Sequence, residues 1–146
     1  MATLVDTSVL AALIRKRSGG HEREVRMARK EMAAGRALIS VVTVAELLVG
    51  ARDAAGASRL GALLRPIPVA PLDEEASVVA GRMGAYARRR GATLPLPDLL
   101  IAATALRLEA SILTIDSDFA RGRSVALADD DPDDDAGLWR TLRIWT

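Results

Sequence analysis

The sequence contains no cysteine. Disulfide bridges, thiolate metal sites and cysteine nucleophiles are therefore excluded. Aromatic residues are also scarce, at 3% of the chain against 50% for all hydrophobic residues, so the core must consist mainly of Ala, Leu, Val and Ile. Such a composition suits helices packed on a sheet. The single histidine, His21, lies in a charged stretch where we expect it to be exposed.

Long apolar runs are missing as well. No stretch approaches the roughly 18 uninterrupted apolar residues that a membrane helix needs. The N-terminal sequence lacks the basic start, apolar segment and cleavage site of a secretory signal. From the sequence we therefore expect a soluble protein, located in the cytoplasm, with no membrane partner.

Charge is distributed unevenly along the chain. Six aspartates lie within residues 129–135, while residues 1–128 carry 18 basic and 13 acidic side chains, a formal charge of +5. This difference predicts a basic body, residues 1–128, followed by an acidic C-terminal tail, residues 129–146. An excess of arginine favours a polyanionic partner, although a charge of +5 over 128 residues is moderate and also common in proteins that bind no nucleic acid. Trp139 and Trp145 would anchor the tail, complete the core or contact a partner.

Short apolar runs alternate with helical patterns along the 146 residues, a length typical of one domain. The alternation predicts an α/β fold with a parallel sheet covered on both faces. We expect strands at residues 2–5, 37–42, 111–115, within 66–71, and as a last strand at 125–128. The expected helices are 9–17, 21–34, 43–50, 57–64, 73–90 and 98–108, with a turn or one helical turn at 116–121.

Acidic residues follow two of the expected strands. Asp6 comes directly after residues 2–5, and Asp116 comes directly after residues 111–115. Because ligands gather beyond the carboxyl ends of parallel strands, both side chains should lie at one rim of the sheet. Glu46 and Asp98 lie near the starts of expected helices. Four converging carboxylates repel one another unless a cation lies among them.

Each acid also has a purely structural explanation. Asp6 could cap the helix after it, Asp98 could belong to a first turn behind Pro97, and Thr43 with Glu46 has the spacing of a capping box. The shared location favours a site instead. Mg²⁺ or Mn²⁺ prefers carboxylate oxygens, and such a site suits the hydrolysis of phosphodiester bonds.

Four segments, taken in order and spacing, resemble the signatures of the PIN-domain ribonucleases of the VapC toxin type. They are residues 5–10 (VDTSVL), 43–47 (TVAEL), 97–103 (PDLLIAA) and 113–119 (LTIDSDF). The resemblance covers about residues 3–120. It implies a three-layer α/β/α sandwich with a mostly parallel central sheet, Mg²⁺- or Mn²⁺-dependent endoribonuclease activity on RNA, a homodimer, and a VapB-type antitoxin protein whose C-terminal segment lies across the acidic site.

The resemblance also assigns roles to residues. According to the resemblance, the catalytic, metal-binding carboxylates are those of Asp6, Glu46, Asp98 and Asp116. Asp118 would be a supporting or alternative fourth acid, and Thr7 and Thr114 would be polar helpers.

Two other interpretations compete with this one. In a non-catalytic α/β interaction domain the acids would be helix caps. A phospho-accepting receiver domain also clusters acids, but it needs a lysine beyond a late strand, and no lysine follows Lys30. Arg82 and residues 88–90 could bind RNA phosphates, or simply complement the dipole at the end of their helix.

Overall fold

The computed structural model describes residues 1–15, 19–130 and 134–145. Five strands form one sheet in the order β3-β2-β1-β4-β5, and every pairing between neighbouring described strands is parallel. The strands are short: β1 (Thr3–Val5), β2 (Ala37–Ser40), β3 (Val69–Ala70), β4 (Ser111–Leu113) and β5 (Arg143–Trp145).

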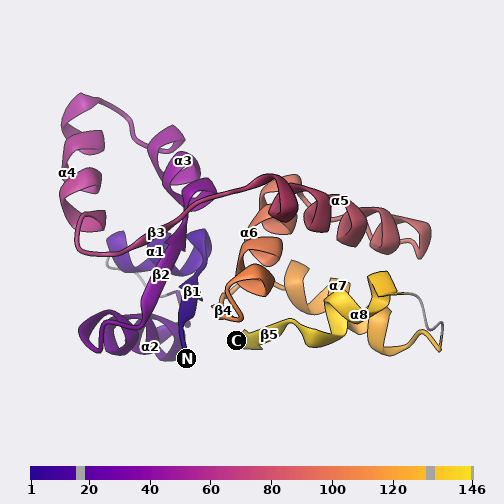
Figure 1. The fold of residues 1–146 in the computed structure, drawn as a ribbon. Helices are drawn as coiled ribbons and strands as arrows, with labels where there is room; N and C mark the ends of the chain where they lie inside the picture. Colours follow the sequence, from indigo (N-terminus) through magenta and orange to yellow (C-terminus); the bar gives the residue numbers. More distant parts are fainter. Residues whose placement is uncertain (16–18, 131–133, 146) are drawn as a thin grey trace.

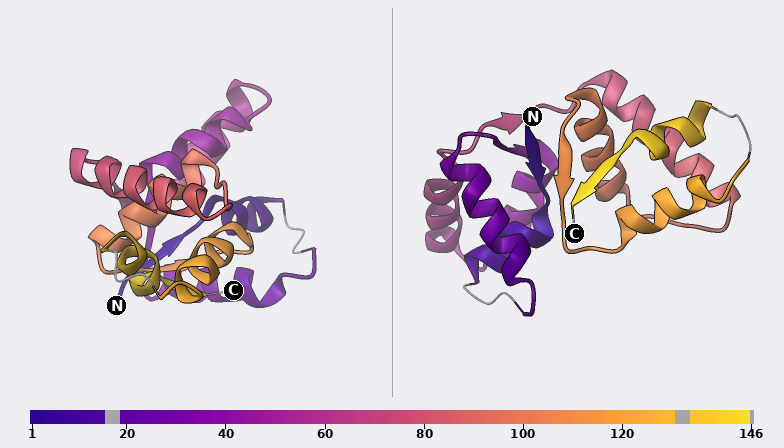
Figure 2. Two further views of the ribbon diagram at one scale, coloured as in Figure 1. Left: turned by 90° about the vertical axis from the view of Figure 1, so that its right-hand side faces the viewer. Right: turned by 90° about the horizontal axis from the view of Figure 1, so that it is seen from below.

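Helices cover both faces of this sheet, which gives the expected three-layer α/β/α sandwich (Figure 1). One layer contains α1 (Thr7–Ile14), α2 (Glu22–Ala33), α3 (Val41–Val49) and α4 (Ala54–Leu64). The other contains α5 (Glu74–Arg89), α6 (Leu96–Arg107), α7 (Asp118–Leu127) and α8 (Asp134–Thr141). The view from below in Figure 2 shows β1, β4 and β5 side by side between the two layers.

The central strands supply both cores. Leu4 of β1 and Ile112 of β4 pack into the cluster under α5 to α8, whereas Val5 and Leu113 pack into the cluster under α1 to α4. All four side chains are at most 1% exposed. Successive strand residues point to opposite faces, so a strand buried on both sides must be apolar at every position. This requirement explains the short apolar runs in the sequence.

The boundary between β2 and α3 lies earlier in the sequence than predicted. The expected strand 37–42 ends at Ser40, because the Ser40 hydroxyl accepts a hydrogen bond of 3.1 Å from the Val42 N–H and caps α3. Thr43 therefore lies inside the helix rather than at its start. The suggested capping box of Thr43 and Glu46 is wrong for this reason.

The predicted last strand at residues 125–128 is also wrong. Residues 118–127 form α7, whose buried side contains Phe119, Gly122 and Ala126 at helical spacing. The last strand is instead β5, which pairs with β4. The end of the expected helix 9–17 and part of the aspartate run, residues 131–133, lie outside the described residues.

The described part of the C-terminal segment belongs to the folded body. The Trp139 side chain on α8 is completely buried, and its Nε1 donates a hydrogen bond of 3.0 Å to the Met83 carbonyl oxygen on α5. Trp145 on β5 is 46% exposed. Of the roles considered for the two tryptophans, completion of the core is thus the one that Trp139 has.

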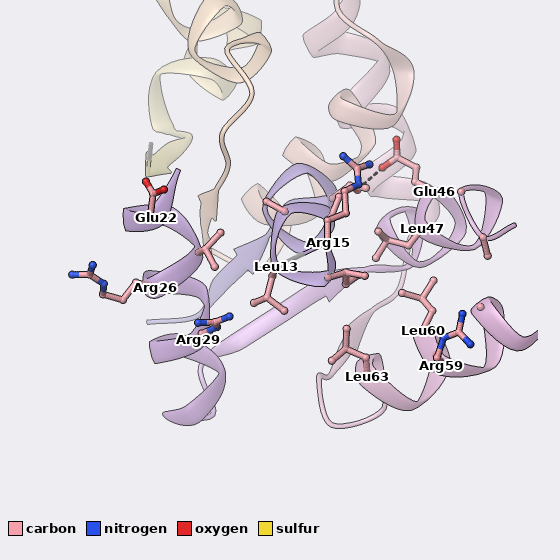
Figure 3. Close-up of a pocket in the computed structure, with 18 residues that line it drawn as sticks. Leu13, Arg15, Glu22, Arg26, Arg29, Glu46, Leu47, Arg59, Leu60 and Leu63 are labelled. Carbon is pink, nitrogen blue, oxygen red and sulfur yellow. Dashed lines mark hydrogen bonds between the residues drawn. The ribbon is translucent and has the colours of Figure 1, made fainter. Parts of the chain in front are cut away.

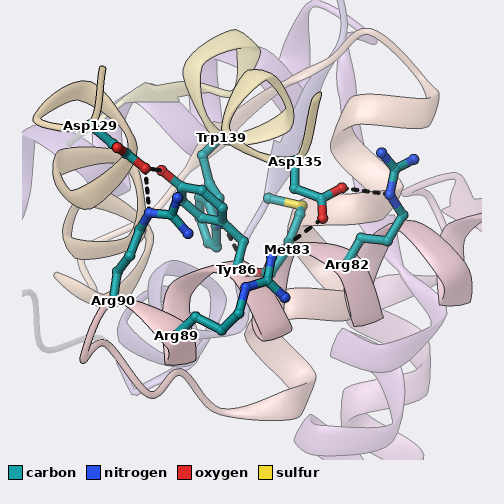
Figure 4. A network of polar contacts seen from close by, with 8 residues as sticks. All are labelled: Arg82, Met83, Tyr86, Arg89, Arg90, Asp129, Asp135 and Trp139. Carbon is teal, nitrogen blue, oxygen red and sulfur yellow. Dashed lines mark hydrogen bonds and ion pairs between the residues drawn. The ribbon is translucent and has the colours of Figure 1, made fainter. Parts of the chain in front are cut away.

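Aspartates of this segment face the arginines of α5 (Figure 4). Arg82 Nε donates to Asp135 Oδ1 at 2.6 Å, and Arg90 Nε donates to Asp129 Oδ2. The Tyr86 hydroxyl donates to the same Asp129 oxygen at 2.6 Å, while the Arg90 guanidinium stacks 3.9 Å from the centre of the Tyr86 ring. Arg89 Nη2 also lies 3.7 Å from Asp135 Oδ2. Three of the arginines considered for phosphate binding therefore contact carboxylates of their own chain.

In the part of the chain that the structure describes, no helix combines the length and apolar character needed to cross a bilayer.

Candidate metal centre

Parallel pairing of β1 with β4 brings the first and last predicted acids to one rim. Val5 is in register with Leu113, and the Asp6 N–H donates a hydrogen bond of 2.9 Å to the Leu113 carbonyl oxygen. Asp6 follows β1 directly, and Asp116 lies in the turn after β4. Both residues therefore lie beyond the carboxyl ends of adjacent central strands, where parallel α/β sheets bind ligands.

The Asp6 carboxylate is held by two hydroxyl groups. Its Oδ2 accepts hydrogen bonds from Ser8 Oγ at 2.6 Å and from Thr114 Oγ1 at 2.9 Å, and the residue is only 3% exposed. No side chain–main chain capping bond joins Asp6 to α1 among the described residues. Both bonds to described residues use one oxygen, so Oδ1 of this carboxylate is the atom available to a cation.

Thr114 connects two of the acids. Its Oγ1 donates to Asp6 and accepts a hydrogen bond of 2.9 Å from the Asp116 N–H. Thr114 is completely buried, so its hydroxyl has a fixed position between the two carboxylates.

Ser8 is a site residue that the sequence reasoning missed. Besides Asp6 it contacts Thr114 Oγ1 at 3.3 Å and accepts a bond of 3.4 Å from the Ile115 N–H. The signal was present in the sequence, since a serine two positions after an aspartate at a helix start can reach back to that carboxylate.

Glu46 reaches the rim from the middle of α3. The Thr7 hydroxyl donates to Glu46 Oε2 at 2.5 Å and lies 3.2 Å from the Thr43 hydroxyl. Thr43 is completely buried. These contacts link the first turn of α1 to α3 and orient the Glu46 carboxylate.

Three aspartates lie close together at the rim. Asp98 lies in the first turn of α6, Asp116 in the turn after β4, and Asp118 at the first position of α7. One carboxylate oxygen from each can be chosen so that all three lie within 4.8 Å of one another. Asp116 Oδ1 also accepts the Asp118 N–H at 3.0 Å. Asp116 and Asp118 therefore both belong to the cluster.

The environment of the cluster alters the pKa of Asp98. Its pKa is raised to about 7 by burial and, after burial, by the negative charges of Asp6, Asp116, Asp118 and Glu46. Burial and the surrounding excess of negative charge thus both disfavour the ionised form of Asp98. A bound divalent cation would remove this excess, and an all-carboxylate set fits Mg²⁺ or Mn²⁺.

The capping explanation of the acids has limited support from the geometry. The N-cap position of α6 is Pro95, and no side chain among the described residues caps that helix. Glu46 lies inside α3, whose cap is Ser40. Only Asp116, of the four predicted acids, accepts a hydrogen bond from a main-chain N–H at a helix start in the described chain.

Comparisons with known proteins agree with this geometry. A family model described as "PIN domain" matches residues 3–124. None of the curated proteins compared with it matches the chain.

Several solved structures have a similar fold. The VapBC2 complex of Rickettsia felis bound to promoter DNA contains a chain with a TM-score of 0.71 and 17% identity, covering 99% of this chain and 98% of that one. The FitAcB structure of Neisseria gonorrhoeae contains a chain with a TM-score of 0.69 and 20% identity, and the match covers 99% of this chain and 96% of that one. A toxin–antitoxin complex of Klebsiella pneumoniae contains a chain with a TM-score of 0.61 and 28% identity, and the match covers 82% of this chain and 91% of that one.

Proposed function

The chain belongs to the PIN-domain family, whose members are generally nucleases, and we propose that it is a metal-dependent endoribonuclease acting as the toxin of a toxin–antitoxin pair. The observation that carries the proposal is the convergence of acids from four segments at the carboxyl rim, with the pKa of Asp98 raised to about 7.

Carboxylates from both sides of the rim form the proposed metal centre. Asp98, Asp116 and Asp118 supply the tight cluster. Asp6 and Glu46 complete it, since both lie close enough for their charges to raise the pKa of Asp98. Bound Mg²⁺ or Mn²⁺ would supply a water of lowered pKa and neutralise charge that develops on the phosphodiester.

The protein's own contribution is the positioning of these oxygens. Ser8 and Thr114 hold Asp6 Oδ2, which leaves Oδ1 for a cation. Thr7 holds Glu46 in the same manner. Because these donors are fixed before the substrate arrives, little reorganisation is needed when the RNA binds. At neutral pH, Asp98 must lose its remaining proton before it can serve as a ligand.

Cleavage of RNA by the purified protein tests this function. We expect cleavage with Mg²⁺ or Mn²⁺, loss of cleavage in EDTA, and loss in Asp98→Asn, which keeps the shape of the side chain but removes its charge. Asp130→Asn, an exposed aspartate outside the cluster, is the matched control and should cleave like the unchanged protein. Cleavage by a folded Asp98→Asn at the original rate would refute the assignment.

A groove beside the centre is the proposed docking site of a VapB-type antitoxin (Figure 3). It has a volume of 1120 Å³, lies between α1, α2, α3 and α4, and reaches Thr7 and Glu46. The structural neighbours are toxin–antitoxin complexes, which supports a partner of this class.

The lining of the groove specifies the chemistry of that partner. Leucines form much of its floor, including Leu13, Leu47, Leu60 and Leu63, and its charged lining residues are Arg15, Arg26, Arg29, Arg59, Glu22 and Glu46. Four arginines against two glutamates favour an amphipathic, acidic segment with an apolar face toward the leucines. A basic side chain at its end would reach Glu46 and compete with the metal.

Mutation of the groove tests this docking. Leu63→Asp, which places a carboxylate at a leucine of the groove that is 38% exposed, should weaken complex formation with the antitoxin at least tenfold in a pull-down titration. Val78→Asp on α5, in the other helical layer, makes the same kind of change at an exposed apolar residue outside the groove and is the control. Equal binding by both variants would place the antitoxin elsewhere.

We also propose a homodimer, as the VapC resemblance implies. Exposed apolar side chains on α3 support it, since Leu48 is 44% and Val49 is 87% exposed, and Leu96 of the adjacent α6 is 63% exposed. Burial of such side chains favours association. Sedimentation should give a dimer for the unchanged protein and a shift to monomer for Val49→Asp; a monomer in both would exclude the dimer.

A further inference from the structure

Arg121 is a cationic residue at the edge of the acidic cluster, and none of the roles given above includes it. It lies in the second turn of α7, and its side chain is 50% exposed. Its Nη2 lies 2.7 Å from Asp118 Oδ1 and also donates a hydrogen bond of 2.8 Å to the Thr93 carbonyl oxygen. One nitrogen of the guanidinium therefore bridges two segments of the site.

The second of these contacts distinguishes Arg121 from an ordinary helix ion pair. A surface pair three residues apart contacts only its own helix and contributes little. Thr93 instead belongs to the segment that leads into α6, the helix that carries Asp98. The guanidinium is thus fixed between the segments that supply two aspartates of the cluster.

The remaining donors of this guanidinium are directed to no described residue. Arginine has five N–H donors, and both contacts of Arg121 to described residues use Nη2 alone. Nε and Nη1 are available to a further acceptor, and half of the side chain is open to solvent. A positive, partly exposed and already oriented guanidinium with N–H donors left over can donate to a phosphate oxygen.

We propose that Arg121 is a substrate-binding residue that holds a phosphate of the RNA beside the metal centre. The inference rests on the proposed function, because it takes the acidic cluster as the place where RNA is cut. Asp118 and Thr93 fix the guanidinium in advance, which lowers the entropic cost of binding the phosphate. Arg121 also offsets part of the negative charge that would otherwise repel RNA from the cluster.

Two binding measurements on folded protein test this role. The first uses a 2′-O-methyl RNA hairpin, which is not cleaved, in fluorescence anisotropy with EDTA present. Arg121→Gln should weaken binding about two- to fivefold, the range that a half-exposed ion pair supplies. The slope of log K against log salt concentration should also become less steep, by about the amount expected for the loss of one phosphate contact. The second measurement is calorimetric titration with Mn²⁺, which should bind Arg121→Gln more tightly because a neighbouring positive charge is gone.

The controls separate this role from a general effect of charge or fold. Arg65→Gln makes the same change of charge at the end of α4, which precedes β3 and therefore lies toward the amino edge of the sheet, away from the site. It should leave Mn²⁺ affinity unchanged and weaken RNA binding less. Arg121→Lys keeps the charge but loses the planar guanidinium that Asp118 and Thr93 orient, so its RNA affinity should lie between those of Arg121→Gln and the unchanged protein.

The outcomes also separate this inference from the proposed function. The role of Arg121 would be overturned if Arg121→Gln, Arg121→Lys and Arg65→Gln all had the same RNA affinity and the same salt dependence. If Arg121→Gln does not fold, an Arg121→Lys variant that binds RNA as tightly as the unchanged protein would overturn it instead. Failure of the unchanged protein to bind Mn²⁺ would overturn the metal centre. Selective loss of RNA binding in Arg121→Gln would in that case still support the phosphate contact.

Discussion

The indole N–H of Trp139 donates a hydrogen bond of 3.0 Å to the main-chain carbonyl oxygen of Met83, in the middle of α5. The tryptophan ring lies against Gly122 of α7. α8 is therefore attached to α5 and α7 by one large buried side chain, and a change at Gly122 acts directly on that contact.

Gly122→Ala should destabilise the fold. A Cβ atom at this position would lie 2.5 Å from the Trp139 ring, and such overpacking typically costs about 1–3 kcal/mol. That cost outweighs the roughly 0.5–1 kcal/mol gained by replacing glycine inside a helix. Gly61→Ala in α4 is the control, because its Cβ would meet no atom within 4 Å. Urea unfolding should show a loss for the first variant and no loss for the second; equal stability would mean that the ring moves aside freely.

Asp129→Asn should also lower stability. The Asp129 carboxylate accepts from the Tyr86 hydroxyl and from Arg90, and its side chain is 22% exposed. Burial and then the bond to Asp129 raise the pKa of the Tyr86 hydroxyl. Loss of a charged acceptor that serves two donors should cost about 1–2 kcal/mol. Thermal melting should show this loss for Asp129→Asn and almost none for Asp130→Asn, and similar melting of the two would contradict the importance of the network.

The metal-free protein should lose stability as pH rises toward neutrality. The pKa of Asp98 is raised to about 7, so between its ordinary value and 7 the folded state binds more protons than the unfolded state does. Stability then decreases with rising pH across this range. Asp98→Asn should flatten the decrease and be at least as stable as the original protein at pH 8. Melting in EDTA from pH 4.5 to 8 measures this, and parallel curves for the two proteins would contradict it.

Metal binding should have the complementary pH dependence. Because a cation binds the ionised form of Asp98, Mn²⁺ affinity should rise as pH approaches 7 and level off above it. Calorimetry at pH 6 and at pH 8 checks this expectation. Equal affinity at the two pH values would mean that Asp98 does not bind the ion.

Glu31 should act at lower pH and with the opposite sign. The hydrogen bond from Arg36 lowers the pKa of Glu31, and Thr3 donates a further bond of 3.1 Å to the same carboxylate. Its contribution to stability is present above the ordinary pKa of a glutamate and disappears as pH falls through the lowered value. Glu31→Gln should therefore destabilise the protein at pH 6 but have little effect near pH 2.5. An equal effect at both values would show that shape matters here rather than charge.

Much of the fold followed from sequence patterns, and the failures have physical causes. Alternating apolar runs and helical patterns predicted the parallel sheet, and Asp6 and Asp116 were expected at its carboxyl rim because each follows a strand. The element 118–127 was missed because the apolar segment around Val125 and Ala126 is compatible with either structure. The deciding contacts, such as that of Gly122 with Trp139, come from distant residues.

The C-terminal elements were harder to foresee. Trp139 lies between an aspartate run and Arg140, a composition typical of an exposed segment, and β5 has only three residues. Burial of the tryptophan depends on the space above Gly122, which no local pattern reveals. At the site, local patterns did not indicate Ser8 or Arg121. Their contacts are with Thr114 and Thr93, which lie far from them in the sequence.

The pairing of β1 with β4 has a consequence for synthesis of the protein. Asp6 leaves the ribosome 108 residues before its hydroxyl donor Thr114. The acids Asp116 and Asp118 follow Thr114. A nascent polypeptide that stops before β4 carries one end of the rim without the other, and contacts between residues so far apart form late in folding. Translation that aborts before β4 therefore releases fragments that lack Thr114, Asp116 and Asp118, and such fragments cannot assemble the acidic cluster.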